Sequence, residues 1–190
     1  MSAGVIRPVR PEQKMIETLR NLLFAEAGAG VYAVLDGASV PGLLDRLTQW
    51  EPARECLYRG EIKPDLAEMA PYLVQMEPDT EFTAWILQEG WGNHWGIFAV
   101  SDADLATVRR HLRTLLVVHD SAGKPLYFRY YDPRVLRVYL PTCNAAELVS
   151  MFGPVSAFLL EDEQPDKLLR FGLESGALAR QEHPVAMEKN

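Results

Sequence analysis

Residues 11–37 read PEQKMIETLRNLLFAEAGAGVYAVLDG and contain a helix pattern, a glycine break and a strand pattern in succession. Apolar side chains recur at helical spacing over residues 11–27, which predicts an amphipathic helix. Gly28 and Gly30 end that helix. The apolar, β-branched run Val31–Leu35 predicts a buried strand directly after it.

The same alternation of helix and strand patterns continues outward from this segment. Further strand patterns lie at 56–59, 72–76, 95–100 and 168–173, and helix patterns lie at 41–50 and 80–90. Residues 116–119 and 126–131 flank a loop rich in turn formers, which predicts an antiparallel hairpin. The order predicts an α/β fold: a mixed sheet with alternating helices, at least one antiparallel hairpin, and a single main domain.

Three helix starts are indicated by capping residues. Asp132 precedes Pro133, which suits the first turn of a helix. Asn144 and Glu147 have the spacing of a capping box. Asp102 and Asp104 follow Ser101, where acidic side chains satisfy the free amides of a first turn rather than bind a cation.

The chain divides into three parts. Residues 1–30 form a flexible arm followed by a helix, and residues 31–160 form the main domain. Residues 161–190 comprise an acidic linker, the last strand candidate and a tail that we expect to be mobile from about Gly176.

Composition excludes several classes of protein. The 190 residues are 48% hydrophobic and 24% charged, which is typical of a globular domain rather than a disordered or disulfide-rich chain. A formal charge of −7 argues against a nucleic-acid or anionic-membrane partner. The two cysteines, Cys56 and Cys143, lie far apart, and no apolar run is long enough to span a membrane. We therefore expect a cytoplasmic protein.

No sequence motif indicates a catalytic, cofactor or metal site. The glycines of Gly28-Ala-Gly30-Val-Tyr-Ala33 follow a helix pattern and precede a strand, the reverse of a dinucleotide site. The four histidines lack metal-ligand spacing, and no serine lies in a nucleophile elbow. We therefore expect no enzyme activity, no cofactor and no metal. A small hydrolase whose carboxylates converge from separate segments remains an alternative.

The segment Arg109–Arg137 is basic in an acidic protein, with seven basic residues against two acidic ones. Within it, residues 127–134 interleave aromatic and arginine side chains, which are typical of binding hot spots. Two interpretations stay open: a contact surface, or an internal cluster in which Arg129 pairs with buried acids and the rings lie in the core. A phosphate- or nucleotide-binding module is a further alternative.

Three tryptophans, Trp85, Trp91 and Trp95, lie within eleven residues beside three glycines. Trp85 shares a helical face with other apolar residues and is expected in the core. Trp91 lies on the glycine-rich loop, which predicts either a partner-binding anchor or a packed corner.

Seven short motifs, in order along residues 31–160, resemble one known family. They are Tyr32-Ala-Val-Leu-Asp-Gly37, Leu57-Tyr-Arg-Gly-Glu61, Ala70-Pro-Tyr-Leu-Val74, Trp95-Gly-Ile-Phe98, Tyr127-Phe-Arg-Tyr-Tyr-Asp-Pro-Arg134, Leu140-Pro-Thr142 and Phe152-Gly-Pro-Val155. Together they resemble the effector adaptor domain of bacterial type VI secretion, a domain long described as having unknown function. The block ending at Arg134 is the most specific.

The resemblance implies a cytoplasmic adaptor or chaperone, encoded near its effector, that is not an enzyme. Such a protein binds a cognate effector, often by its N-terminal region, and helps to load it onto the VgrG spike. Longer relatives carry a C-terminal lobe that helps to select the effector, and little of this chain follows Val155.

For such an adaptor the sequence supplies candidate contact residues. They are Arg129, Tyr131, Arg134 and Arg137 on one patch, and Trp91 on another. Family motifs are as often structural, so Tyr32, Asp36, Arg59 and Tyr130 form an alternative network that holds the fold together.

Overall fold

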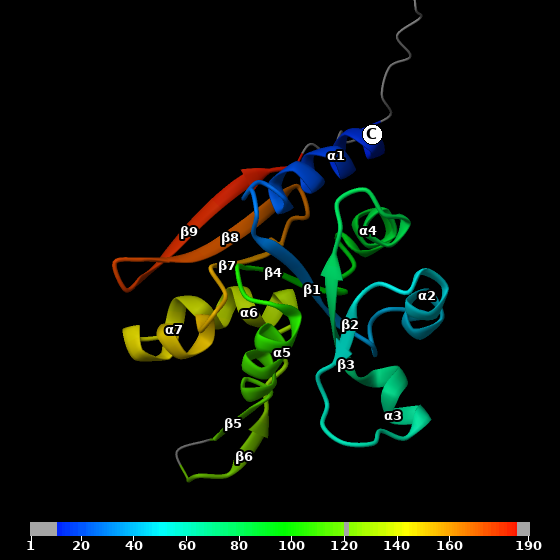
Figure 1. Ribbon diagram of the computed structural model, residues 1–190. Helices are drawn as coiled ribbons and strands as arrows, with labels where there is room; N and C mark the ends of the chain where they lie inside the picture. The colour runs from blue at the N-terminus through cyan, green and yellow to red at the C-terminus, as the bar shows by residue number, and fades with distance from the viewer. Residues whose placement is uncertain (1–10, 120–121, 186–190) are drawn as a thin grey trace, which may run out of the picture.

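A seven-stranded sheet runs through the computed structural model, which describes residues 11–119 and 122–185 (Figure 1). The strands, in spatial order, are β2 (Arg54–Cys56), β3 (Pro71–Met76), β1 (Gly30–Asp36), β4 (Gly96–Ser101), β7 (Ala157–Glu161), β8 (Lys167–Glu174) and β9 (Ala177–Pro184). A separate two-stranded ribbon consists of β5 (Val117–His119) and β6 (Pro125–Tyr127).

The strand β1 lies inside the sheet and is buried on both faces. It pairs with β3 and with β4, so that Ala33 lies opposite Val74 on one side and Phe98 on the other. Alternate β1 side chains enter two different hydrophobic cores, because successive strand residues point to opposite faces. Burial on both faces explains why this strand is a continuous apolar run rather than an alternating one.

Helices cover both faces of the sheet. One core contains α5 (Leu105–Thr114), α6 (Pro133–Tyr139) and α7 (Ala145–Phe152). The short 3₁₀ turn η2 (Leu140–Thr142) directly follows α6. The other core contains α1 (Pro11–Leu23), α2 (Leu43–Trp50), α4 (Glu81–Trp85) and the π-helical turn η1 (Ile86–Gly90). Figure 1 shows α3 (Pro64–Met69) at the start of β3, below α2.

The three predicted helix starts are confirmed by hydrogen bonds. The Asp104 carboxylate accepts from the Thr107 amide at 2.8 Å, and α5 begins at the next residue. Asp132 accepts from the amide of Arg134 at 3.0 Å. Asn144 and Glu147 form a complete capping box at the start of α7.

The predicted α/β class, single main domain and antiparallel hairpin are confirmed, whereas the mixed strand direction is not. Every pairing among the described strands is antiparallel. The helices between strands suggested parallel crossovers, but β1 is flanked in space by β3 and β4, which both run against it. The intervening helices therefore return the chain to neighbouring positions in the opposite direction.

Two predicted strands have different bounds. The strand predicted at 56–59 ends at Cys56, because the Leu57 amide donates to the carbonyl of Pro71, and Pro71 at the start of β3 has no N–H to return a ladder bond. The strand predicted at 126–131 ends at Tyr127, and the chain then turns, with the Asp132 amide donating to the Arg129 carbonyl. The strand β7 and the helix α3 were not predicted.

The prediction of a mobile tail from Gly176 was wrong for residues 177–184. They form β9, which pairs with β8 along its whole length through a turn at Ser175 and Gly176. The φ angles of 52° and 81° at these two residues are those of the tight turn that joins two adjacent strands. The predicted arm at 1–10 and the last five residues lie outside the described part of the chain.

Candidate functional site

Asp36, the last residue of β1, has a buried carboxylate. It binds residues 127–134, which we call the arginine-aromatic segment. Its oxygens accept from the Ala38 amide at 3.2 Å and from the Ser39 hydroxyl at 2.7 Å. It also forms an ion pair with the Arg129 guanidinium. That guanidinium lies 5.9 Å from the centre of the Tyr131 ring, so it is held by a charge and by a ring face.

Asp132 binds Arg134 in the same region. The Arg134 Nε and Nη2 atoms donate to the two carboxylate oxygens at 3.0 and 2.7 Å, a two-point fork. Burial raises the pKa of Asp132, but the hydrogen bonds and charge of Arg134 outweigh burial and hold that pKa below its ordinary value. Asp132 is therefore ionised at neutral pH. Its pair with Arg134 offsets part of the free energy that burial of the carboxylate costs.

The centre of the basic segment has the ring packing that the internal interpretation describes, while the Arg129 side chain stays 45% exposed. Arg129 pairs with the buried Asp36, and the rings of Tyr130 and Tyr131 lie in the core. Only 2% of the Tyr131 surface is exposed, so its ring supports Arg129 rather than offering area to a partner. Arg137 is half-buried, and its Nη1 atom has no hydrogen-bond partner among the described residues.

Trp91 lies in a packed corner beside Glu161. Its indole N–H donates to the Pro165 carbonyl at 2.7 Å. Next to it, the buried carboxylate of Glu161 accepts from the backbone amides of Gly92 and His94 and contacts the His94 ring. The rings of Trp85 and Trp95 are 5.0 Å apart. The structure therefore brings Arg129, Tyr131 and Arg134 together and leaves Trp91 separate.

Three buried carboxylates converge at one end of the sheet, as the hydrolase alternative requires. Asp36 ends β1, Glu161 ends β7, and Asp132 precedes α6. Each already accepts from an arginine or from backbone amides. The space beside Glu161 is about 20 Å³, room for one water molecule rather than a substrate. Among the described residues, no group of acids, histidines and cysteines is arranged to hold a metal ion.

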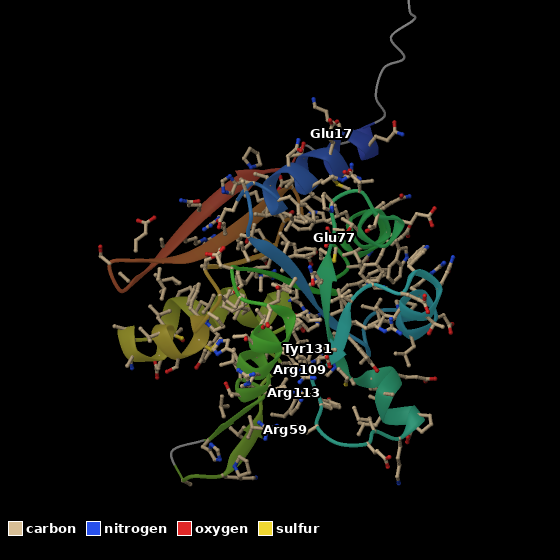
Figure 2. All side chains as sticks on the ribbon, in the orientation of Figure 1. Glu17, Arg59, Glu77, Arg109, Arg113 and Tyr131 are labelled. Atoms are coloured by element: carbon tan, nitrogen blue, oxygen red, sulfur yellow. The ribbon has the colours of Figure 1, made fainter. Side chains whose placement is uncertain are left out.

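The arginines at the start of the basic segment cover an edge of the sheet. Arg113 donates to the carbonyls of Cys56 and Tyr58 at 2.7 and 2.8 Å, and Arg109 pairs with Glu55 of β2. Figure 2 labels both arginines along α5. Three arginines of the basic segment, Arg109, Arg129 and Arg134, therefore pair with acids of the same chain.

An apolar groove lies between the segment that follows β2 and the β5–β6 ribbon. Its volume is about 660 Å³, and the residues that matter below are Tyr58, Arg59, Leu66, Val117 and Tyr127. Leu66, Val117 and Tyr127 are 47, 47 and 48% exposed, so three large apolar side chains share one exposed surface. Figure 2 labels Arg59 beside the ribbon. We call this surface the apolar groove.

Sequence reasoning missed the apolar groove. Its walls come from two segments about sixty residues apart, and one of them contains α3, which was not predicted. One local signal was present: Val117 and Tyr127 are large, exposed side chains that lie opposite each other on a ribbon of three-residue strands. The Tyr58 and Tyr127 rings, 5.9 Å apart, join the two walls.

The model of one protein family matches residues 31–150 of this chain. The family is described as a domain of unknown function, DUF4123. The chain belongs to the DUF4123 family. Comparison with curated proteins and comparison with solved structures both gave no match.

The DUF4123 region contains the basic segment and the apolar groove. It includes Asp36, Arg129 and Arg134, and all the residues that line the apolar groove. It leaves out α1 and the strands β7 to β9. In the part of the chain that the structure describes, no helix combines the length and the hydropathy needed to cross a bilayer.

Proposed function

We propose that this DUF4123 protein is an adaptor, or chaperone, that binds a cognate type VI secretion effector and helps to load it onto the VgrG spike. The apolar groove is the observation that carries the proposal, because it exposes large apolar side chains inside the region that defines the family. The motif resemblance supplies the class of partner. The proposed role requires no catalytic group and no cofactor.

The apolar groove is the proposed contact surface for an effector segment. Full burial of a Val or Leu side chain contributes roughly 1.5–3 kcal/mol, and Leu66 and Val117 each have about half of that still to gain. Such a surface binds an apolar segment of the effector and keeps that segment from aggregating. An adaptor must also release its cargo, so moderate affinity suits the role better than a fully enclosed site.

The arginine pairs act in this proposal as the frame of the apolar groove. Arg113 lines the groove and at the same time fixes the carbonyls of Cys56 and Tyr58. Arg129, two residues after Tyr127, is anchored to Asp36 of the central strand. Both walls are therefore tied to the sheet, and a prearranged surface loses less entropy when it binds.

Co-expression tests the proposed class of function. The chain is expressed with the product of the adjacent effector gene, with and without VgrG, and the complexes are separated by size exclusion. We expect a stable complex with the effector, and a larger one when VgrG is present. Failure to copurify with both the effector and the spike would overturn the proposal.

A further inference from the structure

The two edges of the seven-stranded sheet differ in how they are protected. At one edge, β2 has only three residues, and Arg113 occupies the carbonyls beside it. At the other edge, β9 has eight residues, and no strand among residues 11–119 and 122–185 pairs with its outer side. An unpaired edge of this length is a template for another strand.

The peptide groups that face outward from β9 follow from the register. Glu174 lies opposite Ala177 across a two-residue turn, so these two form a hydrogen-bonded pair. Hydrogen-bonded and non-hydrogen-bonded residue pairs then alternate along the two strands. The peptide groups of Leu178, Arg180 and Glu182 belong to non-hydrogen-bonded pairs and therefore point away from β8. The Val185 amide donates to the Asp166 carbonyl at 2.7 Å, as this alternation requires.

The outward-facing sequence of β9 is complementary to itself. When a second copy of β9 runs antiparallel with Gln181 on the two-fold axis, Arg180 lies opposite Glu182 of the second copy, and Glu182 lies opposite Arg180. Both positions belong to the outward-facing set, so each pair exchanges two backbone hydrogen bonds. Pro184 then lies opposite Leu178 of the second copy. Because it has no N–H, its carbonyl accepts one backbone hydrogen bond and it donates none.

We propose that β9 is a homodimer interface, in which two copies of this chain join their sheets across a two-fold axis. Charge complementarity selects a second copy as the occupant, because opposite charges meet at both Arg180–Glu182 pairs. These side chains are about 44 and 43% exposed, and the carboxylate of Glu182 is already oriented by Arg180 and Lys167. This surface is separate from the apolar groove and does not depend on the proposed adaptor role.

Charge reversal tests the register. Glu182→Arg places arginine opposite arginine twice in the dimer, and we expect the dimer dissociation constant to rise about tenfold. The double variant Arg180→Glu/Glu182→Arg restores opposite charges and is expected to return the constant to near the wild-type value. Both variants lose the Lys167 contact equally, so they are matched. The oligomeric state is measured by analytical ultracentrifugation over a concentration series, and circular dichroism checks the fold.

Cross-linking gives an independent readout of the same geometry. Gln181 would face its own copy in a non-hydrogen-bonded pair with Cα atoms about 4.5 Å apart, within disulfide range. We therefore expect Gln181→Cys to form a covalent dimer under mild oxidation. Ala179→Cys, two residues along the same face, and the wild type should not. A wild type that stays monomeric, or a Gln181→Cys variant that fails to cross-link, would overturn the proposal. So would an edge that binds the effector instead of a second copy.

Discussion

Asp36 is the residue that joins the central strand to the arginine-aromatic segment. It is buried, and its carboxylate receives two local donors and the guanidinium of Arg129. An ionised carboxylate in such a position is stable only while its partners remain. The motif residues around it therefore have a structural role, whatever further role their exposed surfaces have.

Removal of Arg129 should destabilise the fold. We expect Arg129→Ala to lower the free energy of unfolding by about 2–3 kcal/mol, since a buried charge loses its main partner. Urea denaturation measures the change. Arg110→Ala, at an exposed position on α5, is the matched control and should stay within about 0.5 kcal/mol. Equal effects of the two substitutions would contradict the role given to Asp36.

The Asp132 pair predicts a specific pH dependence. Its folded pKa lies below the unfolded value of about 4, so its stabilising contribution is complete above pH 4 and is lost as the pH falls through the folded pKa. Asp132→Asn keeps a good helix cap. We expect the difference in unfolding free energy between wild type and Asp132→Asn to be constant from pH 7 to 5 and to shrink below pH 4. A difference that does not change with pH would refute the pair's contribution.

Local chemistry explains which elements were predictable. The starts of α5, α6 and α7 depend on residues within three positions of each other, so capping rules located them. The strand β9 has a polar sequence, Arg180-Gln-Glu182, and is held by pairing with β8 rather than by apolar burial. The end of β2 depends on where its partner strand β3 begins, at Pro71. Such long-range contacts leave no local pattern.

The features of the candidate site also differ in how far the sequence predicts them. The Arg129 pairing with a buried acid was one of two interpretations of the sequence, since an arginine among aromatic residues fits both a surface and a core. The apolar groove was not predictable, because it exists only where the ribbon meets the segment after β2. Its residues look like ordinary core residues in the sequence.

The capping box of α7 predicts an element-level effect. Asn144→Ala removes the side chain that accepts from the Glu147 amide at 3.0 Å, and we expect a loss of about 1 kcal/mol in thermal or urea unfolding. Ser150→Ala, on an exposed turn of the same helix, should change stability by less than about 0.5 kcal/mol. If Asn144→Ala costs no more than Ser150→Ala, the cap does not stabilise α7.

At the scale of the whole molecule, the charges are arranged unevenly along the chain. The net charge of −7 hides a basic segment whose arginines mostly bind acids and carbonyls of the same chain. The apolar groove is the surface that we propose for a partner, and the edge of β9 is the surface that we propose for a second copy. The two surfaces lie on different elements, so the proposed effector binding and the proposed self-association can be tested by separate substitutions.

The most direct test of the central claim is the affinity of the purified chain for the product of the adjacent effector gene. Calorimetric titration measures this affinity for the wild type and for two variants. Val117→Asp puts a charge into the apolar groove, and Val149→Asp puts the same charge on the exposed face of α7, outside it. We predict that Val117→Asp weakens effector binding at least tenfold, since a buried unpaired carboxylate is costly, while Val149→Asp stays within about threefold of wild type. Equal affinities for both variants, or no binding by the wild type, would contradict the account.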